Sequence, residues 1–504
     1  MLSKINTMAL QGLYSYNVAV EVDLLQGLPN FTMVGLPDTT VKEARERIHS
    51  AIVNSGYEFP RKRITVNLSP ANRRKIGSHF DLPIAVAILV AMGKVELPDA
   101  SKYAFFGELS LDGHVNSITG ALPLAMGAAK LGIRKIFIPK DNLKEVALVK
   151  GIEIYAVSEF KEVVEHFLGE RLLSHEVNGD WFNCEPHYDI DFCDVVGQEA
   201  AKRAILISCS GAHGIFMMGA PGVGKSMLAK RIPTIMPKMS YEECLEVTKI
   251  YSIGGKLDSA RPLITERPFR APHHTITATA LIGGGTRPMP GELSFAHLGT
   301  LFMDEIAEYK GGLLEMLRQP LEDKRVNIVR NSGSYAFPCD IMLVAAANPC
   351  PCGYLSSSDH ECTCSPSSIR NYQNRLSGPL MDRIDLHIWV QSVKYKDLSE
   401  SCEQGMNSEQ MREIVKRTRD IQEKRYKGMG IRFNAQLEGG AVRKYCMLDE
   451  EGEILMEKAF SRMKLSGRGY SKVLKIARTI ADIDESESIK PNHLSEALSY
   501  RERR

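Results

Sequence analysis

Residues 219–226 read Gly-Ala-Pro-Gly-Val-Gly-Lys-Ser, a spacing that is typical of a loop that binds phosphate. An apolar run over residues 214–218 precedes the loop, and a run of helical composition over 227–232 follows it. In that order the glycines let backbone N–H groups surround a phosphate at the positive end of a helix. We expect Lys225 to reach the β- and γ-phosphates of ATP and the Ser226 hydroxyl to bind Mg²⁺. The predicted nucleotide-binding residues, for which a glycine-rich turn is the alternative, are Gly219, Ala220, Pro221, Gly222, Val223, Gly224, Lys225 and Ser226.

Two further runs supply the groups that ATP hydrolysis needs besides the phosphate loop. Residues 301–305, Leu-Phe-Met-Asp-Glu, read as an apolar strand that ends in two acids. Asp304 is placed to hold Mg²⁺ through its water shell and Glu305 to polarise the attacking water, unless the pair is only a solvated turn. A strand over 341–347 ends at Asn348, whose amide is expected to sense the γ-phosphate or to orient the water. The alternative for this residue is a turn Asn before proline.

The segment Leu-Ser-Gly-Pro-Leu-Met-Asp-Arg-Ile-Asp-Leu-His over 376–387 resembles the AAA+ superfamily, within it the magnesium-chelatase-like branch near the MCM helicases. The resemblance implies that Arg383 is an arginine finger, which acts on ATP bound by the neighbouring subunit. A ring would then be the working unit, and such a finger adds several orders of magnitude in rate. The alternative role for Arg383 is a salt bridge with Asp382 or Asp385.

Two other segments resemble parts of an AAA+ module. Residues 465–482 resemble the sensor-2 helix, which implies that Arg468 is the lid arginine on the γ-phosphate. Arg478 is a weaker candidate, because a mid-helix position also suits packing or a surface ion pair. The Asp-Val-Val-Gly-Gln run at 194–198 resembles the segment that packs on adenine.

The composition limits the class of protein that carries these motifs. With 504 residues, 44% hydrophobic and 25% charged, the chain is expected to be a soluble globular protein of two or three domains. We find no apolar run of about 18 residues and no signal-peptide core, so neither a membrane helix nor export is predicted. Eleven cysteines without a secretory signal do not predict a disulfide framework, and a cytoplasmic location is expected. Since the net charge is +2, any contact with nucleic acid must come from local patches.

The patterning predicts an α/β multidomain chain. Residues 1–168 alternate β-rich and helical runs, and 169–193 read as a polar linker. Residues 194–392 read as an AAA+ P-loop α/β core, and 393–504 as a C-terminal helical lid. Strands are expected over 18–24, 63–68 and 135–139, and helices over 40–54, 81–92, 409–425, 451–463, 471–483 and 491–501.

The N-terminal domain resembles the Lon-protease-like α+β fold in residues 106–120 and 128–140. Where that family has its nucleophilic Ser, this chain has Asp81, and where it has its catalytic Lys we align Leu122. An Asp and a Leu cannot form a Ser–Lys dyad, so the domain is expected to be proteolytically inactive. An inactive Lon-like domain is similar to that of the recombination ATPase RadA, which implies a role in assembly or DNA contact.

The stretch between Lys225 and Asp304 is longer than a minimal AAA+ core requires. It resembles the helix-2 insert of the chelatase and MCM branch, which implies a projection towards the pore of a ring. The insert contains His273 and His274, which could be read as metal ligands. We favour a structural or pore-loop role, because adjacent histidines point in different directions on most backbones.

A hairpin is predicted over residues 325–338, where two alternating runs flank Asn-Ser-Gly. Related helicases have a DNA-contacting hairpin at this place, which implies that Arg325, Arg330 and Asn331 meet phosphates at its tip. An ordinary exposed hairpin is the alternative.

Residues 350–364 contain Cys-Pro-Cys and, nine residues later, Cys-Thr-Cys. Two close pairs across a short loop favour a structural zinc site, with free thiols as the alternative and a disulfide as the least favoured. Four thiolates would leave no open position for a substrate. The predicted ligands are Cys350, Cys352, Cys362 and Cys364.

Motifs along the whole chain, to the Ala-Arg-Thr-Ile-Ala-Asp run at 477–482, resemble the YifB/ComM family of magnesium-chelatase-like AAA+ proteins. The resemblance implies a hexameric motor that uses ATP and Mg²⁺ to drive branch migration of single-stranded or branched DNA in homologous recombination and natural transformation. It implies DNA and further copies of the chain as partners, and no membrane.

Three other functions remain open at this point. A chelatase-type AAA+ motor would remodel a protein partner, against which the Lon-like domain argues. An ATP-dependent protease would need the missing Ser and Lys. A nucleotide-regulated binding module that hydrolyses slowly would not need Asp304, Glu305 and Arg383.

Overall fold

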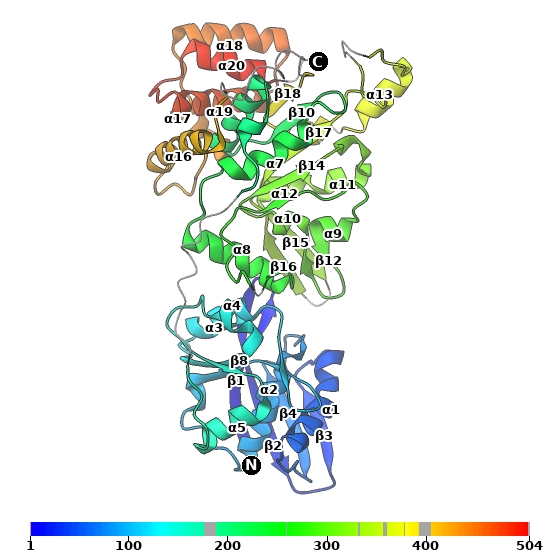
Figure 1. Ribbon diagram of the computed structural model, residues 1–504, viewed down its shortest axis with the longest axis vertical. Coiled ribbons are helices and arrows are strands. Elements are labelled where there is room, and N and C mark those ends of the chain that lie inside the picture. Colours follow the sequence, from blue (N-terminus) through cyan, green and yellow to red (C-terminus); the bar gives the residue numbers. More distant parts are fainter. Residues whose placement is uncertain are drawn as a thin grey trace.

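The computed structural model describes residues 2–175, 188–258, 260–330, 333–355, 360–376, 378–392 and 405–501. These residues form an N-terminal domain, a central domain and a helical lid, which follow one another along the long axis of the molecule (Figure 1). Among the helices so described, none has the length and apolar character needed to cross a membrane.

The N-terminal domain is built on a seven-stranded mixed sheet in the order β3-β4-β2-β1-β5-β8-β9. The long hairpin of β1 and β2 is antiparallel, and β5, β8 and β9 continue the sheet in parallel from β1. A short pair, β6 (Glu108–Leu109) and β7 (Val115–Asn116), lies outside it. The sheet strands are β1 (Leu2–Gln11), β2 (Tyr14–Leu25), β3 (Asn30–Val34), β4 (Arg63–Ser69), β5 (Tyr103–Phe105), β8 (Lys135–Pro139) and β9 (Glu153–Val157).

Alternation along the strands gives this sheet two apolar faces. Phe105 and Phe137 point into a core with α1 (Thr39–Asn54), α2 (Asp81–Ala91) and α5 (Phe160–Leu168). Their strand neighbours Ala104 and Ile136 point to the opposite face. The helices on that face are α3 (Ala121–Lys130), α4 (Leu143–Val146) and, from the central domain, α8 (Tyr241–Ile253).

The central domain is a five-stranded sheet in the order β11-β14-β17-β10-β18, and all its pairings are parallel. The strands are β11 (Phe269–Arg270), β14 (Thr300–Met303), β17 (Met342–Ala347), β10 (Ile215–Met218) and β18 (Leu386–Trp389). Both faces are covered, which explains why these strands read as continuous apolar runs. Helices α6 (Glu199–Gly211) and α7 (Lys225–Ile235) cover one face, and α9 (Ala278–Ile282) to α12 (Arg318–Asp323) lie on the other.

Two antiparallel hairpins extend the central domain towards the N-terminal domain (Figure 1). One is formed by β12 (Gly283–Gly284) and β13 (Met289–Pro290), the other by β15 (Arg325–Arg330) and β16 (Gly333–Pro338).

The lid is helical and packs on α6 and α7 through one continuous apolar core. Side chains cap its helices: Asn407 accepts from Gln410 N at the start of α16, and Ser466 from Gly469 N at the start of α19. The helices are α16 (Ser408–Arg425), α17 (Gly440–Tyr445), α18 (Glu450–Met463), α19 (Gly467–Ile483) and α20 (Pro491–Ser499).

The N-terminal and central domains are joined by a buried, mixed interface. Val247 and Cys244 of α8 belong to the same apolar core as the α3 side of the N-terminal sheet. Glu145 accepts hydrogen bonds from Leu122 N at 2.9 Å and from the Ser252 hydroxyl at the end of α8. Because these contacts are buried, the N-terminal domain is held against the helix that follows the phosphate-loop helix.

The mixed α/β multidomain class with a parallel core sheet is confirmed, and the predicted helices and strands appear within a few residues of their expected ends. The Lon-like character of the N-terminal domain stays a prediction. Asp81 is fully buried and accepts from Arg47 Nε at 2.6 Å, and Leu122 lies in the core. Neither residue supplies the hydroxyl or the amine of a Ser–Lys dyad.

Candidate nucleotide site

The phosphate loop lies at the carboxyl ends of the central strands. It leaves β10 after Met218 and leads into α7, whose N-cap is Gly224 with φ +94°. That backbone angle favours glycine, so the turn depends on this residue type. The first N–H groups of α7 then face the loop, where an anion is stabilised.

Lys225 lies in the centre of the loop. Its ammonium donates to the carbonyl oxygens of Gly219 at 2.7 Å and Ala220 at 2.9 Å, and to Asn348 Oδ1 at 3.1 Å. Burial lowers the pKa of Lys225, while the carboxylates of Asp304 and Glu305 act in the opposite direction. The side chain thus spans the space between β10 and β17, which the predicted sensor residue Asn348 directly follows.

Ser226 and Asp304 are brought together from neighbouring elements. The Ser226 hydroxyl donates to Asp304 Oδ2 at 2.6 Å. A hydroxyl and a carboxylate oxygen at this distance are the hard donors that Mg²⁺ prefers, so the two side chains fit the ion expected there. The residues present can hold Mg²⁺ beside a phosphate on the loop.

Glu305 follows directly in a strained conformation. Its φ is +48°, which is uncommon for a non-glycine residue, and its N–H donates to Asp304 Oδ1 at 3.0 Å. The side chain is about half exposed, and its Oε2 lies 3.7 Å from His274 Nδ1. Sequence reasoning missed this contact, because it assigned His273 and His274 to the insert alone.

The two predicted arginines lie at the other edge of the sheet. Arg383 precedes β18, whose first residue Leu386 pairs with Ile215, whereas the phosphate loop follows the far end of β10. On the order of 10 Å of strand separates the two edges. Arg383 Nη2 donates to Glu322 Oε1 at 2.6 Å, and Arg468 Nη2 lies 3.7 Å from the same oxygen. Both arginines line one cavity of about 800 Å³.

The structure therefore does not bring Arg468 to the phosphate loop of its own chain. Arg468 lies beside Arg383 because the lid is docked on the central domain near the amino ends of its strands. Asp385 lies 3.2 Å from Lys472 Nζ of α19 and 3.0 Å from His213 Nδ1. Burial alone would raise the pKa of Asp385, but Lys472 and His213 hold it well below its usual range.

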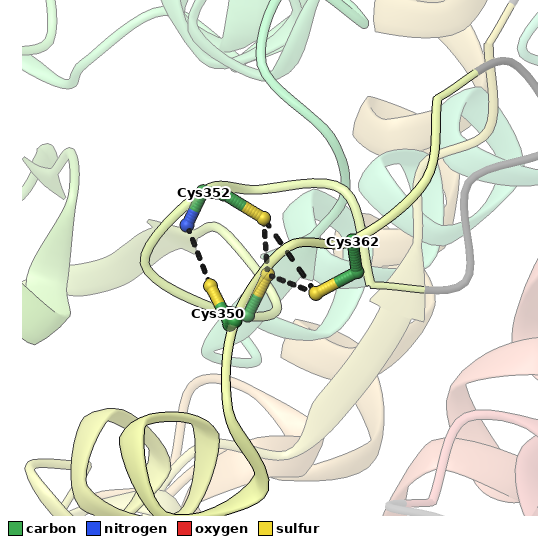
Figure 2. Close-up of side chains that lie close together, drawn as sticks. Cys350, Cys352 and Cys362 are labelled. Carbon is green, nitrogen blue, oxygen red and sulfur yellow. Dashed lines mark hydrogen bonds between the residues drawn. The ribbon is translucent and has the colours of Figure 1, made fainter.

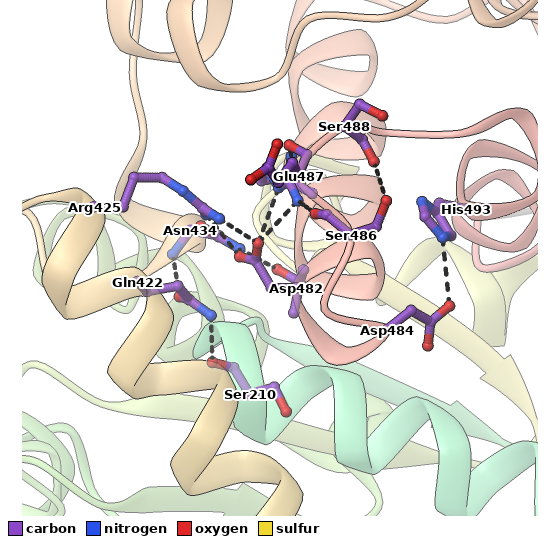
Figure 3. Close-up of polar contacts among 12 residues, drawn as sticks. Ser210, Gln422, Arg425, Asn434, Asp482, Asp484, Ser486, Glu487, Ser488 and His493 are labelled. Carbon is purple, nitrogen blue, oxygen red and sulfur yellow. Dashed lines mark hydrogen bonds and ion pairs between the residues drawn. The ribbon is translucent and has the colours of Figure 1, made fainter.

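Arg478, the weaker lid candidate, is a packing residue. Its guanidinium is 3% exposed, donates to Asp482 Oδ1 at 3.1 Å and contacts backbone carbonyls of the following loop. Figure 3 shows the network around Asp482, which also accepts from Arg425 and Asn434. The network holds Arg478 in the interior of the lid.

The four predicted cysteine ligands converge directly after Asn348. Their Sγ atoms all lie within 4.8 Å of one another (Figure 2), and Cys350 Sγ is 3.3 Å from Cys352 Sγ and 3.7 Å from Cys362 Sγ. Sulfur atoms of a tetrahedral Zn–S₄ site lie about 3.8 Å apart at Zn–S distances of about 2.3 Å, so the donor set fits zinc. Cys364 completes the set and accepts from Cys352 N at 3.4 Å.

The turn that carries Cys350 and Cys352, which we call the cysteine turn, lies against the phosphate loop. Gly353, with φ +84°, is so close that a Cβ on it would lie 2.5 Å from Pro221 Cδ. The cluster thus contacts the loop on one side and continues from the sensor residue on the other.

The hairpin predicted over 325–338 is present, its contact with DNA stays a prediction, and one of the predicted residues is not at its tip. Arg325 pairs with Pro338 at the open end, which corrects its predicted placement. Arg330 pairs with Gly333 next to the turn, and Asn331 lies outside the described residues.

Comparisons with known proteins place the chain among magnesium-chelatase-like proteins. A family model described as magnesium chelatase, subunit ChlI, matches residues 191–398, and its C-terminal counterpart matches 405–501. A third, described as subunit ChlI of Mg-chelatase, matches 20–142. The chain is 40% identical to the uncharacterized protein YifB of Escherichia coli over 99% of this chain and 97% of that protein. The chain belongs to the YifB/ComM family of magnesium-chelatase-like proteins.

Two further relatives bear on function. The competence protein ComM of Haemophilus influenzae is 39% identical over 98% of this chain and 96% of its own length. The DNA repair protein RadA of Streptococcus pyogenes is 32% identical over 84 residues, which are 17% of this chain. Membership in a magnesium-chelatase-like AAA+ family implies an ATPase that uses ATP and Mg²⁺, and the residues around Lys225 fit that chemistry.

Proposed function

We propose that this protein is a ring-forming AAA+ ATPase whose catalytic sites lie between subunits. The observation that carries the proposal is the division of the candidate residues over two edges of one sheet. Lys225, Ser226 and Asp304 lie at the carboxyl edge, whereas Arg383 and Arg468 lie at the amino edge. A site with both sets requires two copies of the chain, and a closed ring repeats that contact. We propose a hexamer, as the resemblance to the family implies.

Within such a site each residue has a defined task. Lys225 and the N–H groups of α7 bind the β- and γ-phosphates, and Glu305 orients and polarises the attacking water. Ser226 and Asp304 would hold Mg²⁺, which when bound would neutralise charge on the phosphates. Arg383 and Arg468 of the adjacent copy stabilise the charge that develops on the γ-phosphate. To do so, both arginines must leave Glu322.

We propose that hydrolysis drives DNA translocation and branch migration in homologous recombination and natural transformation. The names of two relatives support this: ComM is a competence protein and RadA a DNA repair protein. The β15–β16 hairpin, with Arg330 beside its turn, offers a contact for a DNA strand. We place the protein in the cytoplasm, where its DNA substrate would be.

The second candidate is a chelatase-type motor that remodels a protein partner. A ChlI model matches residues 20–142 in the N-terminal domain, which favours this candidate. The presence of this domain therefore no longer argues against a chelatase-type motor. Genes for a pigment pathway beside the gene for this protein would favour this candidate.

The test is the ATPase rate without DNA, with single-stranded DNA, with duplex and with a three- or four-way junction. Lys225→Ala serves as the blank, because it removes the ammonium that binds phosphate. Stimulation that is greatest with a junction would support the branch-migration motor. Equal rates with every DNA would contradict it and favour a protein-remodelling motor, whose partner a pull-down would then identify.

A further inference from the structure

Exposed arginines gather where the N-terminal domain meets the two hairpins of the central domain. Arg73 and Arg74 lie in the loop that follows β4, and Arg287 lies in the turn between β12 and β13. A Cβ on Gly77 of the same N-terminal loop would lie 3.9 Å from Arg287 Nη2. Arg330 reaches the β12–β13 hairpin, where a Cβ on Gly284 would lie 3.5 Å from its Nη2. We call these four arginines the junction patch.

Two tyrosines of β2 lie within or beside the patch. The Arg73 guanidinium stacks 4.7 Å from the Tyr16 ring centroid, and the Tyr16 hydroxyl donates to the Arg74 carbonyl at 3.2 Å. Tyr14 lies two residues earlier on the same face of the strand and is 74% exposed. It stands next to Leu13 at the β1–β2 turn, close to the hairpin tip, where a Cβ on Gly333 would lie 3.7 Å from Gln11 Nε2.

Within the described part of the chain, no carboxylate forms an ion pair with any of the four arginines. This concentration of positive charge helps to lower the pKa values of two neighbouring side chains. Burial lowers the pKa of Lys75, and Arg73 lowers it further. Burial likewise lowers the pKa of His79 to about 4, with a further contribution from Arg287. The chain as a whole has a net charge of only +2, so the positive potential at this junction is local.

Uncompensated arginines with an exposed aromatic ring have the chemistry that binds a nucleic-acid strand. The guanidinium groups neutralise phosphates, and a ring such as that of Tyr14 stacks on an unpaired base. The patch shares Arg330 with the β15–β16 hairpin, and the loop that carries Arg73 and Arg74 reaches the adjacent β12–β13 turn through Gly77.

We propose that the junction patch binds the backbone of the DNA strand handled by the β15–β16 hairpin, so that the N-terminal domain forms part of the DNA-binding surface. This inference rests on the proposed DNA motor and assigns to its N-terminal domain a direct contact with substrate.

The test is DNA binding by the full-length protein with a non-hydrolysable ATP analogue, measured by fluorescence anisotropy of a labelled single strand at several salt concentrations. Arg73→Ala/Arg74→Ala is expected to weaken binding on the order of tenfold and to reduce the slope of log K against log salt by about 1.4, the loss of two phosphate contacts. Tyr14→Ala is expected to weaken binding of single strands more than of duplex, because only unpaired bases stack on it.

The matched control is Arg61→Ala/Lys62→Ala, which removes two exposed basic residues at the opposite end of β4. It should bind like the wild type. Wild-type affinity and salt slope in Arg73→Ala/Arg74→Ala would overturn the inference while leaving the DNA motor intact. Failure of the wild type to bind any DNA would overturn both. Loss of the ring by light scattering in the double variant, together with the loss of binding, would assign the patch to subunit contact and also overturn the inference.

Discussion

At the scale of single residues, Glu322 shows how the nucleotide site is divided. Its carboxylate contacts Arg383 and Arg468 at once, and both side chains stand at the edge of the sheet opposite to Lys225. In the proposed composite site, two arginines that share one carboxylate come from the same copy of the chain. The proposal then assigns Arg383 and Arg468 to one copy and Lys225 to its neighbour.

Mixed assemblies test this division. Arg383→Ala is expected to lower the ATPase rate at least about 1000-fold, because an arginine finger contributes that much. Lys225→Ala is expected to be inactive, because it lacks the ammonium that binds the phosphates. When the two variants are mixed, some interfaces combine an intact loop with an intact arginine, and part of the activity should return. The measurement is phosphate release at a fixed total protein concentration.

A mixture of Arg383→Ala with Arg468→Ala is the discriminating control for that experiment. Both changes affect the amino edge, so no interface receives both arginines from one copy and activity should stay low. Recovery in this mixture would mean that Arg468 acts on the nucleotide of its own chain.

Much of this site is predictable from the residues because the motifs are local. The phosphate loop and the Asp304-Glu305 pair each follow a strand directly, so parallel pairing brings them to one edge. The position of Arg468 cannot be predicted from its neighbours in sequence, because it depends on the docking of α19 on the core through Lys472 and Asp385. The placement of Arg325 was available from the sequence, because pairing of the two alternating runs that flank Asn-Ser-Gly places it at the open end.

At the scale of elements, the cysteine turn joins the end of β17 to the phosphate loop. Gly353 approaches Pro221 so closely that the position of the turn and that of the loop depend on each other. A metal held by the four thiolates would fix the turn and thereby the sensor residue Asn348.

We expect about one zinc per chain in protein purified without chelator. Cys352→Ser/Cys362→Ser should lose the metal and weaken ATP binding, because the turn no longer supports the loop. Metal analysis by mass spectrometry and calorimetric titration with ATP check the two effects. Cys193→Ser, outside the cluster, should keep both zinc and affinity, and a zinc-free wild type with full affinity would contradict the assignment.

The loop that contains His79 predicts a dependence of stability on pH. His79 is fully buried, its Nε2–H donates to the Met8 carbonyl at 3.0 Å, and Arg287 faces it from the β12–β13 turn. Burial lowers its pKa from 6.5 to about 4, so the neutral form is favoured in the folded state. Neutral His79 contributes fully to the free energy of unfolding above pH 6.5. This contribution, about 3 kcal/mol at most, is lost as the pH falls towards 4.

Urea unfolding between pH 4.5 and about 7.5 measures this dependence. His79→Gln, whose amide can still donate to Met8, should flatten the decline in the free energy of unfolding below about pH 6.5. His114→Gln, at an exposed histidine, is the control and should follow the wild type. An unchanged decline in His79→Gln would assign the acid sensitivity to other groups.

At the scale of the whole molecule, the N-terminal domain and the central domain share a buried core. The hydrogen bond between Glu145 and Ser252 joins residues 107 positions apart in sequence. No local pattern predicts such a contact, which explains why the sequence indicated separate domains and not their docking. The domains should therefore move together whenever α8 moves.

Glu145→Ala tests the docking. The change leaves Leu122 N–H and the Ser252 hydroxyl without their acceptor, which costs about 1–3 kcal/mol for buried groups. Scanning calorimetry should show one transition for these two domains in the wild type and an earlier, separate transition in the variant. Glu145→Gln keeps an acceptor and should remain close to the wild type, and identical melting of all three proteins would contradict the prediction.

Because Arg383 and Lys225 lie at opposite edges of the central sheet, the proposed activity depends on the concentration of the protein. In the proposed composite site, a chain that meets no neighbour would bind ATP without hydrolysing it, so we expect specific activity to rise with protein concentration and to fall on dilution. Turnover then scales more steeply than the number of copies in the cell. In the proposed ring, the expression level alone would therefore change the activity per chain, with no inhibitor and no covalent modification.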